Sequence, residues 1–193
     1  MEREIARERM PGNGNSYKAV PYELAQLSAP LSATPERAVD IVWNWYNPDD
    51  PYFRFDGGRL LAIVFPHFSE AFSSRLIFML TTHAERGADF VIAILQNFHG
   101  QPFLYGVGRE LVRQLPENDK RIGQVDIILQ GTGVVMGEFG LVEAYKRKKE
   151  EISPWLEDPD PRVRAFAERY SRELDRAAAA EQRRSEQSHE LRR

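Results

Sequence analysis

The chain has 193 residues, of which 42% are hydrophobic, and this length is enough to bury one ordinary core. Its formal net charge of −3 gives no overall attraction to nucleic acid, so a phosphate-binding surface would have to be a local basic patch. The absence of cysteine excludes disulfides, thiol catalysis and cysteine-containing zinc sites, and it favours a reducing, cytoplasmic location. No apolar run has the length of a signal peptide core or a membrane span, so we expect no membrane partner.

The two ends of the chain differ in composition from its middle. Residues 1–20 mix acids and arginines with the sequence PGNGNS, and we expect them to form a mobile N-terminal arm. Residues 21–180 are expected to form one helical domain. Residues 181–193 are charged, follow a run of good helix formers and lack an apolar stripe, so they predict a charged extension of the last helix.

Short breaks divide the middle of the chain into a series of predicted helices. Thr34-Pro35 and Ser69 mark two helix starts, and the glycine-rich stretch 131–140 marks a break. The apolar runs LLAIVF and FVIAIL fit a strand or a helix, and the surrounding helical pattern favours helix. Second helices that begin near residues 51, 88, 119 and 161 predict about four antiparallel hairpins. The predicted helices cover residues 34–46, 69–83, 88–98, 102–115, 118–130 and 139–155.

The stretch WLEDPDPRVRAFAERYSREL, residues 155–174, reads as a junction between two helices. Asp158 and Pro159 form the turn, Asp160 accepts hydrogen bonds from the first amides of the new helix, and Pro161 occupies its first position. At 100° per residue the next apolar residues fall on one stripe, which predicts a helix that docks along one face. The stripe consists of Val163, Phe166, Ala167, Tyr170 and Leu174.

The same junction recurs 110 residues earlier without a gap, as WYNPDDPYFRFDGGRLLAIV. The identities fall on the cap, on the first-turn proline and at equivalent helical angles. Gly57 replaces Ala167 in this copy, and the pair Gly57-Gly58 costs about 1 kcal/mol per glycine in a helix, so we expect a tight contact there. The matched pairs are Trp45 with Trp155, Asp50 with Asp160, Pro51 with Pro161, Arg54 with Arg164 and Arg59 with Arg169.

These residues resemble the HEAT-repeat superfamily, whose pattern is an apolar first helix, an Asp-Pro turn, and then Val-Arg and an alanine on the second helix. The resemblance spans roughly residues 20–185. It implies an all-α fold, a right-handed α-solenoid of about four antiparallel hairpins whose second helices line a concave surface. It also implies that Arg164 and Arg54 bond to an acidic turn residue of an adjoining repeat. The repeat signature consists of Trp45, Asp50, Pro51, Arg54, Trp155, Asp158, Asp160, Pro161, Val163 and Arg164.

The sequence predicts no catalytic residue, metal site or cofactor. His67, His83 and His99 are spaced by sixteen residues, but they fall at the ends of successive antiparallel helices, which alternate between two edges. The glycines of residues 131–140 lack the Lys-Ser or Lys-Thr that a phosphate-binding loop needs. Acid pairs such as Asp49-Asp50 have no serine or histidine placed to form a nucleophile with them.

Basic residues on the last two predicted helices suggest an interaction surface. The alternative is a solvated helix face. The interaction hypothesis predicts an acidic protein surface as the partner, since the net charge disfavours phosphate. Arg169 and Arg172 lie off the apolar stripe, so we expect them to contribute to binding and not to stability. The candidate residues are Arg59, Lys146, Arg147, Lys148, Lys149, Arg162, Arg169, Arg172 and Arg176.

The resulting functional hypothesis is a non-catalytic protein–protein interaction module or adaptor. The oligomeric state stays open. The alternative is a nucleic-acid-binding protein, or a HEAT-like DNA glycosylase that excises alkylated bases, a group that presents Trp, Asp and Arg to the base. These residue types are present as Trp43, Trp45, Asp50, Arg54 and Arg59.

Overall fold

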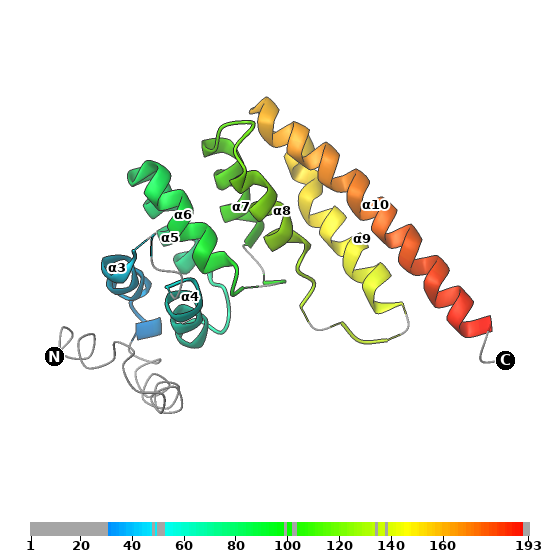
Figure 1. The fold of residues 1–193 in the computed structure, drawn as a ribbon, viewed down its shortest axis with the longest axis horizontal. Coiled ribbons are helices and arrows are strands. Elements are labelled where there is room, and N and C mark those ends of the chain that lie inside the picture. The colour runs from blue at the N-terminus through cyan, green and yellow to red at the C-terminus, as the bar shows by residue number, and fades with distance from the viewer. Residues whose placement is uncertain are drawn as a thin grey trace.

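The computed structural model describes residues 31–190 with short gaps, and the described part of the chain is all-helical (Figure 1). The gaps are residues 48, 50–52, 99, 102, 103, 134 and 138, and the side chains of residues 53–56, 84 and 188–190 are also not described. The runs LLAIVF and FVIAIL lie inside helices, as predicted. The helices are α3 (Pro35–Trp45), α4 (Phe53–Val64), α5 (Glu70–Thr82), α6 (Ala84–Leu95), α7 (Leu104–Gln114), α8 (Arg121–Gln130), α9 (Gly140–Ile152), the 3₁₀ helix η2 (Ser153–Glu157) and α10 (Pro161–Glu190).

Local residues set the ends of α5 and the start of α6. The Ser69 hydroxyl accepts a hydrogen bond from the Phe72 amide at 3.2 Å, so α5 begins where the sequence predicts. The His83 amide donates to the Met79 carbonyl at 3.1 Å and ends α5. The same histidine is the residue before α6, which begins at Ala84 instead of the predicted residue 88. The apolar run alone did not reveal this extra polar turn of α6.

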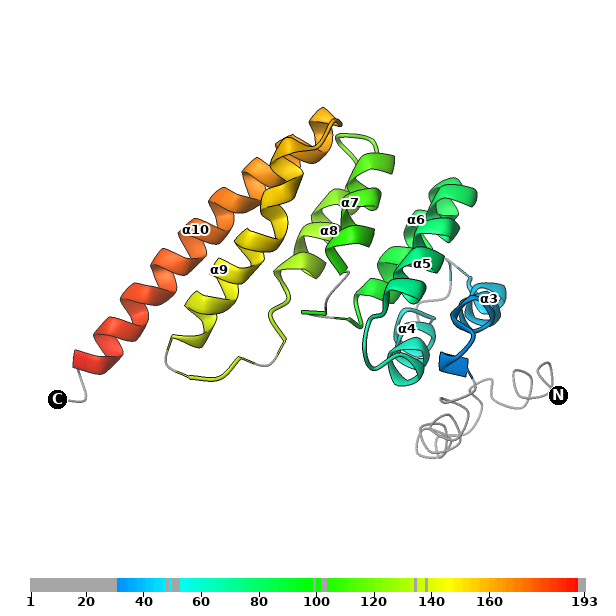
Figure 2. The ribbon, with the colours of Figure 1, turned by 180° about the vertical axis from the view of Figure 1, so that it is seen from behind.

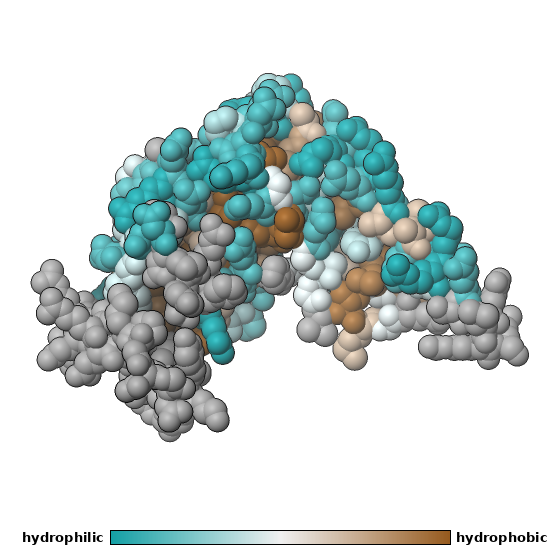
Figure 3. Space-filling view, in the orientation of Figure 1, coloured by the Kyte–Doolittle hydropathy of each residue, from teal (hydrophilic) through white to brown (hydrophobic). Residues whose placement is uncertain are grey.

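Helices that follow one another in sequence pack as pairs. In the described part of the chain, α3 packs with α4, α5 with α6, α7 with α8, and α9 with α10. The first helices contact in the order α3, α5, α7, and the second helices in the order α4, α6, α8, so the pairs form a row (Figures 1 and 2). The last pair departs from this order, because α10 packs against α7 as well as α9. Figure 3 shows an arched molecule with hydrophobic residues in its hollow.

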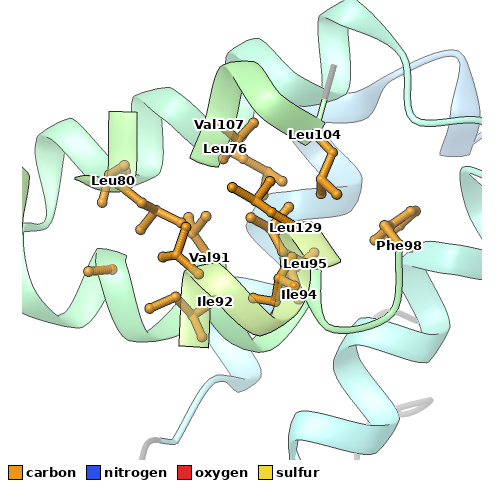
Figure 4. Close-up of a cluster of buried hydrophobic side chains, with 14 of the residues drawn as sticks. Leu76, Leu80, Val91, Ile92, Ile94, Leu95, Phe98, Leu104, Val107 and Leu129 are labelled. Carbon is orange, nitrogen blue, oxygen red and sulfur yellow. The ribbon is translucent and has the colours of Figure 1, made fainter. Parts of the chain in front are cut away.

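One continuous apolar cluster runs through the row from α3 to α10. Figure 4 shows its centre, where leucines, valines and isoleucines from four helices meet. Leu76 comes from α5, Val91 from α6, Leu104 from α7 and Leu129 from α8, and all four are buried. Burying one such side chain stabilises the fold by about 1.5–3 kcal/mol. Each pair therefore depends on its neighbours for much of its burial.

Glycine lets α4 approach α6 closely. Gly57 and Gly58 are both buried inside α4. A Cβ atom at Gly58 would lie 2.0 Å from the Asn97 side-chain nitrogen and 3.1 Å from the Ala93 carbonyl oxygen. A larger residue would displace the Asn97 side chain and press on the backbone of α6. The tight contact expected at this glycine pair is confirmed at Gly58, and it explains why α4 carries the cost of a glycine there.

The last helix docks along the predicted stripe. Its five stripe residues are all buried. At its start, an Asp160 carboxylate oxygen accepts a hydrogen bond from the Arg162 amide at 2.8 Å, and Pro161 is the first helical residue. The predicted cap, first-turn proline and apolar face are confirmed. The helix then continues without a break to Glu190, through most of the predicted extension.

The structure does not support the equivalence of Trp45 and Trp155. Trp45 is 42% exposed at the end of α3, whereas Trp155 is 3% exposed inside the core. The difference arises because η2 follows α9 and turns Trp155 inward, whereas α3 simply ends at Trp45. Trp43 is the tryptophan of α3 that packs on the core, with its ring 5.0 Å from that of Phe90. Asp50, Pro51, the Arg54 side chain and the predicted arm at residues 1–20 lie outside the described parts of the structure.

Replacing Val163 with aspartate is expected to unfold the last helix pair. The new carboxylate would enter an apolar interface without a partner, at a cost of about 4 kcal/mol or more. Ala165→Asp adds the same charge two residues along at an exposed position and is expected to change stability by less than about 0.5 kcal/mol. Urea unfolding followed by circular dichroism measures both. Equal losses in the two variants would contradict the docked face of α10.

Candidate functional site

The nine candidate basic residues divide into an internal and an exposed group. Lys148 belongs to the internal group, with 5% of its surface exposed. Its Nζ atom donates hydrogen bonds to the carbonyls of Leu129 and, at 2.8 Å, Gly131, at the end of α8. Burial lowers the pKa of Lys148, the charge of Arg147 lowers it as well, and only Glu151 acts to raise it. Lys148 thus closes the C-terminal end of α8 and is not part of an exposed surface.

Arg162 and Arg169 are partly exposed, and both bond to the third helix pair. The Arg162 guanidinium donates to the carbonyl of Arg113, in the last turn of α7, at 2.6 Å and to that of Leu115, just after the helix, at 3.2 Å. The Arg169 guanidinium donates to the Asp126 carboxylate of α8 at 2.8 Å and lies over the Phe166 ring. Each side chain is still 39% exposed, so their role in partner binding stays a prediction, but both arginines also bond within the protein. Helical angle alone did not show that α7 and α8 reach this flank of α10.

A buried carboxylate joins the last two helix pairs. The Asp158 side chain has no exposed surface and accepts a hydrogen bond from the Asp160 amide at 2.8 Å. Its other oxygen bonds to Arg109 and, at 3.0 Å, to Arg113, both on α7. Burial alone would raise the pKa of Asp158, but these hydrogen bonds and the two guanidinium groups outweigh it and lower the pKa.

The arginines that hold the turn differ from those that the resemblance implies. Arg164 donates to the carbonyls of Asp158 at 2.6 Å and Pro159 at 3.0 Å, which belong to its own turn and not to an adjoining repeat. The acidic turn residue does bond to the adjoining pair, but through Arg109 and Arg113. The sequence signal for these two residues is their spacing of four, which puts both on one face of α7.

Two of the exposed candidates lie on α10. Arg172 and Arg176 are exposed, and Arg183, which sequence reasoning missed, follows at about 20° from Arg172 around the helix. We call these three residues the arginine ridge. Among the described residues, no carboxylate lies within salt-bridge distance of these three arginines. Arg183 was missed because residues 181–193 were considered separately from the last helix. In the structure α10 continues unbroken to Glu190, so Arg183 keeps the same helical phase as Arg172 and Arg176.

The other exposed candidates lie on α9 and α4. Lys146 pairs with Glu143 at 2.8 Å, and Lys149 pairs with Asp175 of α10 at 2.7 Å. Arg147 of α9 and Arg59 of α4 are exposed as well. Figures 1 and 2 place α4 and α10 at opposite ends of the row. The predicted continuation of the basic flank from Arg169 to Arg59 is therefore wrong, because Arg59 lies on a distant pair.

A polar groove separates α6 from α8 and has a volume of about 340 Å³. Arg121 reaches across it, bonding to Asp119 at 3.0 Å and to Asp89 at 3.2 Å. Hydrogen bonding to Asp119 raises the pKa of Arg121, although burial opposes the shift. The one guanidinium group in the groove lining is therefore already bonded to carboxylates of the protein. Its lining consists of Tyr46, Glu85, Asp89, Ile92, Ala93, Gln96, Asp119, Lys120, Arg121 and Gln124.

The aromatic and histidine candidates are part of the packing. The Trp43 ring stacks on His83 at 4.5 Å, and the Arg86 guanidinium lies over the ring at 4.5 Å. Trp155 lies in another pair, against Tyr105 and Phe166. Within the described ranges no three His, Asp or Glu side chains are grouped to hold a metal ion. No described helix combines the length and the apolar character needed to cross a membrane.

No protein-family model, curated protein or solved structure matches the chain.

Arg169→Glu is expected to destabilise the protein, whereas Arg172→Glu is not. A carboxylate at position 169 would face Asp126, which is mostly buried, so we expect a loss of about 2 kcal/mol. Arg172 is exposed, and its replacement is expected to change the free energy of unfolding by less than about 0.5 kcal/mol. Chemical denaturation of the two single variants provides the measurement. Equal stability of the two variants would contradict a contribution of the Arg169–Asp126 ion pair to folding.

Asp158→Asn tests the buried carboxylate through the pH dependence of stability. Because the folded state lowers the pKa of Asp158, its contribution is complete above about pH 5 and is lost as the pH falls below about 4. We expect the variant to lose about 1.5–3 kcal/mol at pH 7 and the difference from the wild type to shrink toward pH 3. Asp175→Asn, at an exposed pair, is the control and should change stability by less than about 1 kcal/mol at any pH. Urea unfolding at several pH values provides the measurement. A difference in the free energy of unfolding between Asp158→Asn and the wild type that stays constant with pH would contradict a role for the Asp158 charge.

Proposed function

We propose that the chain is a HEAT-like, right-handed α-solenoid that acts as a non-catalytic protein–protein interaction module, and that its arginine ridge binds an acidic surface of a protein partner. The row of helix pairs with one shared core supports the scaffold part of this proposal. The arginine ridge supports the binding part and is the observation that carries it.

Apart from the exposed Arg147 of α9, the other arginines of the last two pairs have an internal or local role. Arg109, Arg113, Arg162, Arg164 and Arg169 each bond to a carboxylate or a carbonyl. The ridge residues have no such partner among the described residues and span about 16 Å of α10. Their guanidinium groups can each bind a carboxylate in a two-pronged geometry. This spacing suits a partner with separated carboxylates.

Acidic neighbours favour a protein over nucleic acid as the partner. Glu168, Asp175 and Glu186 are exposed on the same helix beside the ridge. They would repel the continuous phosphates of a duplex, and the whole chain carries a net charge of −3. A protein surface can place basic groups opposite these carboxylates and acidic groups opposite the arginine ridge, and so match both.

The binding test compares the ridge with a matched set of exposed arginines. Arg172→Glu with Arg176→Glu changes the charge by the same amount as Arg59→Glu with Arg147→Glu. The probe is a labelled helical peptide with glutamates at spacings of four and seven residues, followed by fluorescence anisotropy. We expect the ridge variant to bind at least about tenfold more weakly than the wild type and the control to change little.

Two outcomes would contradict the proposal. Equal weakening in both double variants would show that overall charge, and not the ridge, attracts the peptide. Tighter binding to duplex DNA than to the peptide, with a steep log-linear loss as salt rises, would favour the nucleic-acid alternative.

A further inference from the structure

Two carboxylates border the groove between α6 and α8 on its α6 side. Glu85, Asp89 and Gln96 lie within about 40° of one another around α6, and all three line the groove. Glu85 is exposed, and its carboxylate forms no ion pair with any residue that the structure describes. The Asp89 side chain is 45% exposed and offers one oxygen to Arg121. Carboxylates one helical turn apart repel each other, so an additional cation would stabilise them.

The α8 side of the groove ends in an exposed apolar residue. Lys120 and Gln124 line this side. Ile127 follows Gln124 by one turn and lies about 60° from it around the helix, at the rim of the groove. Among the large hydrophobic side chains of the described α-helices, Ile127 is the most exposed, at 69%. The groove therefore passes from an acidic end to an apolar rim.

Contacts at the two ends of the groove fix the register of α6 against α8. At one end Arg121 donates to Asp89 at 3.2 Å, and these residues are 32 apart in sequence. Beyond the other end, a Cβ atom at Gly100 would lie 3.2 Å from the carbonyl oxygen of Thr132, which is also 32 residues later. An equal offset at both ends means that the two helices run parallel. Each residue of α6 is therefore level with the residue 32 positions later in α8.

This register gives the spacing of the groups along the groove. At 1.5 Å per residue, Asp89 lies about 6 Å from Glu85, and Ile127 lies about 15 Å from Glu85. Alternate side chains of an extended chain lie on one face about 6.8 Å apart, so three of them span about 14 Å. An extended segment can thus place one side chain at each of the three residues. Its main chain also has unpaired polar groups, whereas a helix uses these groups internally.

We propose that the groove between α6 and α8 binds an extended, basic segment of a protein partner. Two lysine or arginine side chains at alternate positions face Glu85 and Asp89, and an apolar side chain two residues further along faces Ile127. The side-chain amides of Gln96 and Gln124 have no partner among the described residues, and they can bond to the main chain of the segment. This surface is distinct from the arginine ridge and prefers the opposite charge, so the inference goes beyond the proposed function.

The two cations of the groove limit the strength of this binding. Arg121 bonds to both oxygens of Asp119 at 3.0 Å, so these two charges largely cancel. Lys120 is exposed on the opposite rim and would repel a basic segment. The attraction that remains comes from Glu85 and the accessible side of Asp89. We therefore expect a weak complex that salt dissociates.

An NMR titration of the full chain tests the proposal. The probes are two synthetic peptides with the cores Lys-Ser-Lys-Ser-Leu and Leu-Ser-Lys-Ser-Lys, flanked by glycine and serine, so that both chain directions are sampled. We expect one of them to shift the side-chain amide signals of Gln96 and Gln124. Replacing its leucine with serine is expected to weaken binding at least about threefold, because the apolar contact with Ile127 is lost.

Matched variants test the two carboxylates. Glu85→Gln with Asp89→Asn removes two charges from the groove and is expected to weaken the peptide at least about fivefold. Glu150→Gln with Glu157→Gln removes two charges at exposed positions of the last helix pair and is expected to leave the Kd within about twofold. Lys120→Gln is expected to strengthen binding about twofold, because it removes a repulsion. Circular dichroism verifies that each variant is folded.

Three results would overturn the proposal. The first is the absence of shifts at Gln96 and Gln124 with about 5 mM of either peptide. The second is equal weakening in the two double variants, which would show that overall charge attracts the peptide. The third is spermine binding as tightly as the peptide and shifting the same signals, which would assign the carboxylates to a free polyamine and leave no role for the apolar rim.

Discussion

Mutual burial between helix pairs is the constraint on which the rest of the structure depends. The surroundings of α7 illustrate it. A Cβ atom at Gly108 would lie 3.2 Å from a Leu129 methyl group and 3.6 Å from the Trp155 ring, so α7 is held between α8 and η2. On the earlier side of the row, the Phe98 ring is 5.1 Å from Phe68 and 5.3 Å from Phe72. Since the apolar surface of one pair is covered by the next, the pairs stabilise one another.

Polar side chains set the position of the last pair on this apolar row. Asp158 is held by α7, Arg162 bonds to carbonyls at the end of α7, and Arg169 and Lys148 bond to α8. A buried charge that loses its partner is costly, so the buried Asp158 and Lys148 favour this docking of the last pair. We suggest that this network is the reason that α10 packs on α7. It also decides which basic residues of α10 remain available on the surface.

The division of the basic residues links the packing to the proposed function. A face of α10 that serves as an internal joint cannot also bind a partner, and the arginine ridge lies on the opposite side from the core stripe. The regular spacing of the ridge results from the unbroken helix, because α10 keeps a single register from Pro161 to Glu190. A break in the alanine run would have separated Arg183 from the other two arginines. Helix continuity is thus as important for the proposed interface as charge.

Local sequence features determined the helical class, several helix ends and the buried stripe of α10. Ser69, Asp160 and Pro161 act through contacts within one turn, so their roles follow from neighbouring residues alone. The period of Val163, Phe166 and Tyr170 is likewise a local property. The equivalence of Trp45 and Trp155 was not reliable, because burial depends on what lies beyond the end of each helix.

Only the tertiary structure decided which charged residues are internal. Lys148 and Lys149 are neighbours in sequence, but one points to the end of α8 and the other to Asp175 near the surface. Arg169 and Arg172 lie on the same flank of α10, and only the first reaches Asp126. The physical reason is that a helix period gives the angle of a side chain and not the identity of the helix opposite it. That identity depends on the packing of pairs distant in sequence, which no local pattern encodes.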